Sequence, residues 1–231
     1  RYEAGVNPAD DGTATPRTSS SDSQTADCVV QQDKYPYNYI IWGKSMSDVS
    51  EGAVYLSNNL YASTNTNYGA TSMLCTGASW DSMLDFIKDS SHSVTDGTTW
   101  GNYGDSETYT INRGKYAKYA ALISTWNDYN TELANCVTYT NETSTKVVAT
   151  SSSNAILLTT GASDACKKMN IYDLAGNVWE WTLECEASTG LPCVNRGGSC
   201  KSTGIKTASS SNSCSVNNNN NSTGFRVSLF K

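Results

Sequence analysis

The C-terminal third of the chain carries the feature that most constrains the fold, an aromatic and glycine-rich frame around a polar segment. Residues 170–199 read NIYDLAGNVWEWTLECEASTGLPCVNRGGS, and residues 224–230 read GFRVSLF. Between them, residues 200–223, here called the polar segment, are almost all small and polar. Aromatic side chains bury large areas and anchor cores, so the outer stretches indicate a rigid frame. The polar segment has no comparable structural reason for its composition, and we interpret it as the functional part.

The overall composition favours a loop-rich extracellular domain or a viral structural protein over a cytosolic enzyme. Apolar residues make up 38% of the 231 residues and charged residues only 16%, both below the usual globular share. Ser, Thr, Asn, Gly and Tyr fill the difference. The length suffices for one large domain or two small ones. Because no repeat and no linker divides the sequence, we expect a single domain over residues 1–231.

The charge and hydropathy of the chain argue against two classes of partner. A net charge of −6 and a pI near 4.8 leave no basic surface for phosphates, so we expect no nucleic-acid partner. No apolar run approaches the length that spans a membrane. The chain begins at Arg1 without Met or a signal-like segment. We therefore interpret the chain as a fragment or mature form, in which any export signal or anchor is not included.

Eight cysteines and a single histidine limit the metal and redox chemistry. No CxxC motif occurs and the only histidine is His92, so zinc sites of the finger or ribbon type are not expected. His92 lies in the Ser-rich sequence DSSHSVTDG, which is more typical of a solvated loop than of a buried catalytic base. Many disulfide pairings are open to eight cysteines. The best local pair is Cys185 with Cys193, and buried unpaired thiols are the alternative.

Two helices are predicted from the spacing of apolar residues. Ser79 is expected to cap the clearer helix, whose apolar face consists of Trp80, Met83, Leu84 and Ile87. A weaker helix is expected after a cap at Ser47, with Gly52 as its weak point. Its apolar positions are Val49, Ala53, Leu56 and Leu60.

Short strands are predicted at both ends of the chain and near residue 157. Residues 1–5 and 225–230 indicate the terminal strands, and residues 155–160 (AILLTT) indicate a buried strand or turn. A strand at each terminus predicts that the two termini pair with each other.

Two carboxylates in the frame are spaced for a cation-binding loop. Asp173 and Glu180 are seven residues apart with Gly176 between them, so backbone carbonyls there would complete the oxygen shell that Ca²⁺ prefers. The alternative is structural: Asp173 caps a helix or turn, and Glu180 pairs with Arg196 or Arg226.

The motifs of the frame resemble one known family. IYDLAGNVWEWT, then RGGS at residues 196–199 and GFRV at residues 224–227, are similar to the formylglycine-generating-enzyme branch of the C-type lectin fold. The upstream WGN at residues 100–102 and the helix around SWDSMLDFIK have the same order. The resemblance implies an α+β fold with a small twisted antiparallel sheet, two helices and much irregular loop. It also implies a structural Ca²⁺ held by Asp173, Glu180 and the carbonyls of Gly176 and Val178.

The same resemblance separates two functions. Enzymes of that family use a pair of cysteines shortly after RGGS to bind copper and oxidise a protein cysteine. Here Cys200 follows Ser199 directly and the next cysteine is Cys214, which departs from that spacing. We therefore expect a protein that is not an enzyme and requires no cofactor, with the copper oxidase as the alternative.

A closer resemblance is to the variable proteins of diversity-generating retroelements, in which adenine-directed mutagenesis rewrites a segment between RGGS and GFRV. Of the 24 residues of the polar segment, 16 are Ser, Thr or Asn, as substitution of adenines in Asn codons would produce. The alternative is a low-complexity polar loop. The predicted ligand-binding residues are Cys200, Lys201, Ser202, Thr203, Ile205, Lys206, Ser211, Asn212, Ser213, Cys214, Val216, Asn217, Asn218 and Asn219.

This second resemblance implies a receptor-like or adhesin-like protein on a bacterial surface, outside the cell or on a phage particle. The implied ligand is a protein or a surface glycan. Because the polar segment lacks aromatic residues, we expect binding to rely on fixed neighbours such as Trp181 or nearby tyrosines. A structural protein of a phage virion or pilus tip is the remaining alternative. The oligomeric state does not follow from the sequence.

Overall fold

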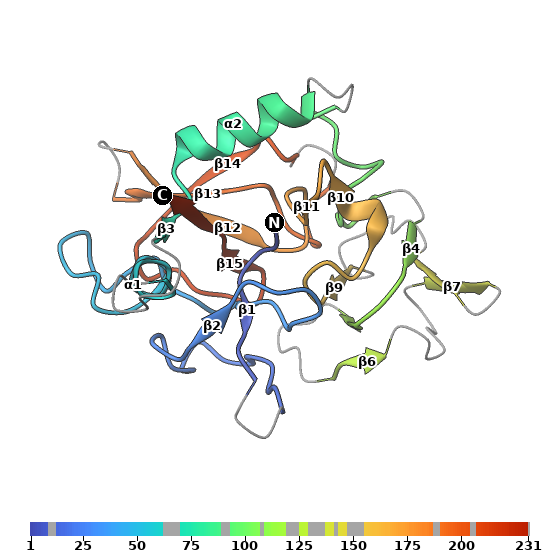
Figure 1. Ribbon diagram of the computed structural model, residues 1–231, viewed down its shortest axis with the longest axis horizontal. Helices are drawn as coiled ribbons and strands as arrows, with labels where there is room; N and C mark the ends of the chain where they lie inside the picture. The colour runs from blue at the N-terminus through green and yellow to red at the C-terminus, as the bar shows by residue number, and fades with distance from the viewer. Residues whose placement is uncertain are drawn as a thin grey trace.

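The computed structural model describes residues 1–8, 13–61, 70–88, 93–106, 109–118, 125–128, 137–140, 143–146, 155–186, 190–203 and 207–230. These residues form an α+β architecture with two α-helices, small sheets and long irregular connections, as predicted (Figure 1). The helices are α1 (Ala53–Asn59) and α2 (Gly77–Lys88), and a 3₁₀ turn, η2, covers Asp164–Cys166.

The strands of the described residues are short. Their bounds are β1 (Gly5–Val6), β2 (Cys28–Val29), β3 (Thr71–Leu74), β4 (Tyr109–Ile111), β5 (Lys115–Lys118), β6 (Asn127–Asp128), β7 (Val137–Thr140), β8 (Thr143–Lys146), β9 (Ile156–Leu158), β10 (Lys167–Lys168), β11 (Ile171–Tyr172), β12 (Trp179–Cys185), β13 (Cys193–Arg196), β14 (Ser211–Cys214), β15 (Thr223–Phe225) and β16 (Val227–Phe230).

The central sheet has the order β14-β13-β12-β15. The first three strands pair antiparallel, whereas β15 runs parallel to β12 with Trp179 opposite Thr223. The predicted small antiparallel sheet is thus confirmed, with the addition of one parallel strand pair at this edge. The chain leaves β14 through a loop and returns beside β12, where the Trp179 amide donates to the Ser222 carbonyl at 2.7 Å. The polar segment thus supplies β14 and the first residue of β15.

The apolar face of α2 is confirmed, but its cap is not the predicted residue. Trp80, Leu84 and Ile87 are buried together. The helix begins at Gly77, and the Thr76 hydroxyl accepts a hydrogen bond from the Ser79 amide at 3.0 Å. Thr76 is therefore the N-cap and Ser79 lies one turn inside, because the capping oxygen bonds to the amide three residues on.

Helix α1 is shorter than predicted because the backbone turns at Gly52. Gly52 has φ +94°, and a Cβ there would lie 2.8 Å from the Ile41 carbonyl oxygen. The helix begins after this residue, so neither Ser47 nor Val49 belongs to it. The predicted weak point inside a helix is in fact its first boundary, since only glycine adopts this conformation without strain.

The terminal strands are also arranged differently from the prediction. At the N-terminus β1 begins at Gly5 and pairs with β2, not with the C-terminus. The C-terminal stretch is divided at Arg226 into β15, in the central sheet, and β16, which pairs antiparallel with β3. The ends still contact each other, because the Ala4 amide donates to the Phe225 carbonyl at 2.9 Å and the Arg226 guanidinium to the Arg1 carbonyl at 3.4 Å. The predicted strand near residue 157 is confirmed as the buried strand β9.

The core consists of several apolar clusters around the central sheet. One cluster contains Ile40, Trp42, Trp181 and Phe225, and a second is formed by α2 with Trp100 and Leu174. In Figure 1, α2 lies along the side of the molecule that holds β14 and β13. The Trp80 indole donates to the Ala208 carbonyl at 2.9 Å, which ties α2 to the polar segment. No helix among the described residues is long and apolar enough to cross a membrane.

Candidate functional site

An open pocket of about 440 Å³ lies on the polar segment. Its walls come from the polar segment, from Ser199 just before it, from strand β13 and from the first residue of β12. The lining residues are Trp179, Asn195, Ser199, Lys201, Ser202, Thr203, Asn212, Asn218, Asn220, Ser222 and Thr223. Residues that are far apart in the sequence therefore share one concave surface.

The chemistry of this lining is uniform. Nine of the eleven residues carry an amide or a hydroxyl, and the other two are Lys201 and Trp179. The lining contains neither a carboxylate nor an aliphatic side chain. Such a surface offers many hydrogen-bond donors and acceptors, one cation and one aromatic ring. It suits recognition of a polar, largely uncharged ligand.

Asn195 forms the base of this pocket. Its side chain is only 1% exposed, and its Nδ2 lies 3.6 Å from the sulfur of Cys214. The Nδ2 of Asn212 lies 3.0 Å from the same sulfur. Burial raises the pKa of the Cys214 thiol, and the neighbouring Asn amides oppose that shift. The Oδ1 atom of Asn195 is buried and has no hydrogen-bond partner.

The backbone of the polar segment is held by distant parts of the frame. The Trp42 amide donates to the Val216 carbonyl, and the Tyr39 amide donates to the Asn220 carbonyl, both at 2.9 Å. The Gly104 amide donates to the Ser202 carbonyl at 2.8 Å. These bonds do not involve side chains of the segment, so side-chain changes there leave them intact.

Side chains of the segment also cap its own turns. The Asn220 Oδ1 accepts from the Ser222 amide and hydroxyl, each at 2.8 Å, and from the Thr223 hydroxyl at 3.2 Å. The Ser202 hydroxyl accepts from the Ser199 amide at 3.1 Å. Asn and Ser side chains commonly stabilise turns in this way. Some polar residues of the segment are therefore structural.

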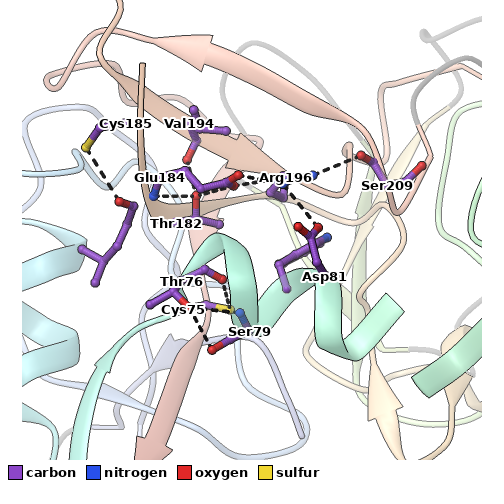
Figure 2. Close-up of polar contacts among 12 residues, drawn as sticks. Cys75, Thr76, Ser79, Asp81, Thr182, Glu184, Cys185, Val194, Arg196 and Ser209 are labelled. Atoms are coloured by element: carbon purple, nitrogen blue, oxygen red, sulfur yellow. Dashed lines mark hydrogen bonds and ion pairs between the residues drawn. The ribbon is translucent and has the colours of Figure 1, made fainter. Parts of the chain in front are cut away.

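Arg196, the arginine of RGGS, connects the sheet to α2 and to the segment (Figure 2). Its guanidinium forms a bidentate pair with Glu184, with N–O distances of 2.6 and 2.7 Å. It also donates to the Ser209 carbonyl at 3.3 Å and contacts Asp81 at 3.4 Å. The hydrogen bonds from Arg196 lower the pKa of Glu184. This network anchors the middle of the polar segment.

The structure distributes the predicted ligand-binding residues over three environments. Lys201, Thr203, Ser211, Asn212 and Asn217 are exposed. Partly buried positions are Ser202, Ser213, Val216, Asn218 and Asn219, and fully buried ones are Cys200 and Cys214. Ile205 and Lys206 lie outside the described residues. The two buried cysteines therefore pack beneath the surface in this structure and are not exposed to a ligand.

The aromatic neighbour of the pocket is Trp179, not Trp181. Trp181 is fully buried in the core and donates to the Ile40 carbonyl at 2.9 Å. Trp179 is partly exposed and lines the pocket. The frame residues Trp179, Asn195 and Ser199 were missed because they lie outside the polar segment. For Asn195 the sequence did offer a signal. Side chains alternate along a strand, so Asn195 lies on the same face of β13 as Cys193.

Glu180 is paired with Arg226, as the structural alternative predicted. Both side chains are buried, at 1% and 3% exposure, and their N–O distances are 2.8 and 2.7 Å. One guanidinium bonds both carboxylate oxygens, so a cation at Glu180 would lie close to the Arg226 charge. Gly176 lies against the Asn102 backbone, and Val178 packs in an apolar cluster. The predicted ligands at Gly176 and Val178 are backbone carbonyls, which this side-chain packing does not involve, so a calcium ion at these four positions stays a prediction.

Asp173 is fully enclosed with a second carboxylate, Glu3. Its Oδ2 accepts from the Gly161 amide at 2.6 Å, and its Oδ1 has no hydrogen-bond partner. Burial raises the pKa of Asp173 to about 7. Burial, with the nearby Asp173 and Glu180, also raises the pKa of Glu3 well above its usual value. Among the described residues, no three His, Cys, Asp or Glu side chains are arranged to hold a metal ion.

The cysteines after RGGS do not lie together. Cys200 packs with Val178 and Leu157, whereas Cys214 belongs to the cluster around Trp181. In the central sheet Cys193 lies opposite both Cys185 and Cys214, and all three are thiols. The predicted Cys185–Cys193 neighbours are thus opposite each other without being bonded. His92 lies outside the described residues.

A larger pocket of about 630 Å³ lies near the N-terminus around Arg17. Arg17 donates to the carbonyls of Asn38, Ser23 and Tyr39, at 2.6, 2.7 and 3.0 Å. Its guanidinium therefore holds the backbone together and is not directed at a ligand. The polar-segment pocket, with its partnerless Asn195 oxygen, is the better candidate site.

Comparison with known proteins places this arrangement in one family. A family model described as the sulfatase-modifying factor enzyme 1-like domain matches residues 99–229, more than half of the chain. No curated protein and no solved structure matches the chain significantly. The matched range includes the central sheet, Arg196 and the whole polar segment. The chain therefore belongs to the sulfatase-modifying factor enzyme 1-like domain family and has the small α+β, C-type lectin-like fold of that family.

Proposed function

We propose that the protein binds a ligand through the pocket on the polar segment and has no enzymatic activity. The observation that carries this proposal is that eight of the eleven lining residues come from residues 200–223, while Trp179, Asn195 and Ser199 come from the frame. Functional residues are commonly found on loops that a rigid scaffold positions. The hydrogen bonds from distant frame residues to the segment backbone supply that scaffold here.

The polar segment is diversified between sister proteins by adenine-directed mutagenesis of its codons. The composition of the segment and the framing motifs RGGS and GFRV support this proposal. The exposure pattern supports it too, because Lys201, Thr203, Ser211 and Asn217 project from a backbone that frame residues hold. A change at these positions alters the surface and leaves the fold in place.

A copper oxidase of the formylglycine-generating type is the less supported function. It requires two thiols that bind one copper ion, and Cys200 and Cys214 pack in separate clusters. Addition of Cu(I), followed by competition with a chelator, tests this point. Thiol-dependent binding together with oxidation of a cysteine-containing peptide would replace the binding proposal by the enzymatic one.

The decisive test of diversification is the DNA next to the gene. We expect a near-identical template of the region coding for residues 200–223, differing mainly at adenines, and a reverse-transcriptase gene nearby. Absence of both contradicts diversification. Ligand binding is tested separately, by exchanging the exposed residues of the segment for those of a sister protein. Binding should change its target while the melting temperature stays the same.

The proposed location is a bacterial surface, the cell exterior or a phage particle. The proposed partner is a protein or a surface glycan, and the acidic charge argues against nucleic acid. A virion or pilus-tip structural role would instead require the polar segment to be covered by a partner chain.

The proposed binding needs no cofactor. For a structural calcium ion at Asp173 and Glu180, a chelator that leaves the melting temperature unchanged argues against the site.

A further inference from the structure

The base of the pocket contains a buried acceptor that the protein itself does not satisfy. Asn195 is 1% exposed, yet its Oδ1 has no hydrogen-bond partner. An unpaired buried polar atom costs free energy, and most such atoms in folded proteins are paired with protein or water. Its Nδ2 is directed at the Cys214 sulfur, which leaves the Oδ1 for another donor. Because Asn195 lines the pocket, a ligand bound there is a source of the missing donor.

Trp179 provides a flat apolar surface in the same pocket. It is the first residue of β12 and lies opposite Thr223, also a lining residue, across the parallel pair with β15. It is partly exposed, unlike the buried Trp181 two residues on. An indole contributes contact area at low cost in conformational entropy. The pocket thus combines an aromatic face, a buried acceptor and a ring of amides and hydroxyls.

We propose that Asn195 and Trp179 form a fixed subsite for a neutral saccharide, a proposal that rests on the binding function above. One sugar hydroxyl donates to the Asn195 Oδ1, and the C–H face of the same ring lies on the Trp179 indole. Since Oδ1 is buried, the side chains above it shift when the hydroxyl enters. The amides and hydroxyls of Asn212, Asn218 and Ser202 then bond the remaining sugar hydroxyls.

The lining chemistry favours a saccharide over a protein surface. Protein interfaces depend on a few large anchors, mainly Trp, Tyr and Arg, that are desolvated in apolar pockets. This pocket has one such residue and no aliphatic side chain. It also has no carboxylate to meet a basic peptide, and Lys201 is its only cation. A polyhydroxylated neutral ring matches the nine amide and hydroxyl residues better than either.

The subsite also has a consequence for sister proteins. Asn195 and Trp179 belong to the frame, outside residues 200–223. Diversification of the segment would then change which saccharide is selected, while every sister protein would keep the acceptor and the aromatic face. The class of ligand would be constant and its identity variable.

The experiment applies the folded full chain to an array of immobilised neutral, sialylated and sulfated oligosaccharides. We expect binding to neutral saccharides, which is weakened about tenfold or more in both Asn195→Ala and Trp179→Ala. Asn58→Ala is the matched control, because Asn58 is an exposed position on α1 away from the pocket, and it should bind like the wild type. Near-ultraviolet circular dichroism and the melting temperature verify that each variant is folded.

Deoxy analogues of the bound saccharide give a second readout that a purely structural role of Asn195 would not produce. Removal of the hydroxyl that meets Asn195 should weaken binding to the wild type and have no further effect on Asn195→Ala. Neutral saccharides bound equally well by both variants overturn the subsite. If the chain binds a protein through the segment and no saccharide, the subsite is wrong and the binding function stands. If the chain binds no ligand through the segment, both the subsite and the proposed binding function are wrong.

Discussion

The buried ion pair of the frame, Glu180 with Arg226, and the pocket on the polar segment both contain polar groups. The polar side chains of the two regions differ in their partners. In the frame, Glu180 and Arg226 are paired with each other at almost no exposure. In the segment, the backbone is bonded to the frame and to short turns, and exposed side chains such as Lys201 and Asn217 face solvent.

This difference separates stability from recognition. A buried ion pair is intolerant of single changes, because removal of one partner leaves an uncompensated charge. Exposed side chains away from such features usually alter stability by little. The protein therefore has one region whose residues are fixed by folding and another whose residues can be chosen by the ligand. The predictions below test this separation, from the largest expected effect to the smallest.

Loss of the buried arginine should have the largest effect. Arg226→Met should lower the free energy of unfolding by about 3 to 5 kcal/mol, because Glu180 is left buried without its partner. Denaturant unfolding followed by tryptophan fluorescence measures this loss. The double variant with Glu180→Leu should recover much of the stability, because the unpaired charge is gone. If Arg226→Met is as stable as the wild type, the buried pair does not make the frame less tolerant of substitution than the polar segment.

The enclosed carboxylates should make the stability fall as the pH rises. With its pKa raised from 3.8 to about 7, Asp173 keeps a proton in the folded state that it loses on unfolding. This contribution is fully present below the unfolded pKa and is lost as the pH rises through the folded one. We expect a decrease of about 3 kcal/mol between about pH 4.5 and pH 7.5, measured by urea unfolding with a chelator present.

Asp173→Asn is the matched variant for this pH dependence. It keeps an oxygen for the Gly161 amide but removes the titration, so the decrease should become smaller. Glu3 and Glu180, whose pKa values burial also raises, provide the remainder. Asp164, whose pKa Arg113 lowers to about 2, acts in the opposite direction only at more acidic pH. An unchanged pH profile in Asp173→Asn would mean that Asp173 is ionised in the folded protein.

Oxidation should add a smaller stabilisation within the frame. The Glu186 amide donates to the Pro192 carbonyl, so the adjacent Cys185–Cys193 pair is not hydrogen-bonded. Cα atoms in such pairs are about 4.5 Å apart, within the range of a disulfide. Oxidised glutathione should be reduced to two thiols as this bond forms, with a stabilisation of about 2 kcal/mol.

Peptide mapping by mass spectrometry identifies which cysteines have joined. Cys185→Ser should abolish the new disulfide, and Cys214→Ser should leave it in place. A link from Cys193 to Cys214 instead would join the frame to the polar segment, and would break the separation between the two regions.

Substitutions at exposed positions of the segment should have the smallest effect on stability. Lys201→Ala, Thr203→Ala and Asn217→Ala should each change the free energy of unfolding by less than about 0.5 kcal/mol. Thr223→Ala is the contrast within the segment, because Thr223 is buried and donates to Asn220, and it should cost about 1 kcal/mol. Thermal and denaturant unfolding measure all four. Equal losses at exposed and buried positions would contradict a surface that is free to vary.

Elements with a local periodic signal were predictable from the sequence. The apolar face of α2 and the buried strand β9 follow from spacing and composition over a few residues. The cap at Thr76 and the start of α1 at Gly52 were not, because both depend on local backbone geometry that neighbouring residues impose. The φ of Gly52 follows from its close approach to the carbonyls of residues 41 and 42.

The sequence by itself determined the division of the C-terminal third into frame and polar segment, because the two differ in the types of residue that they contain. Only the tertiary structure decided that Glu180 pairs with Arg226 and that β15 lies parallel to β12. Tertiary packing also buries Trp181 and leaves Trp179 in the pocket beside Asn195. The physical reason is that ion pairs, strand order and pocket walls join residues distant along the chain, and spacing in the sequence carries no information about such contacts.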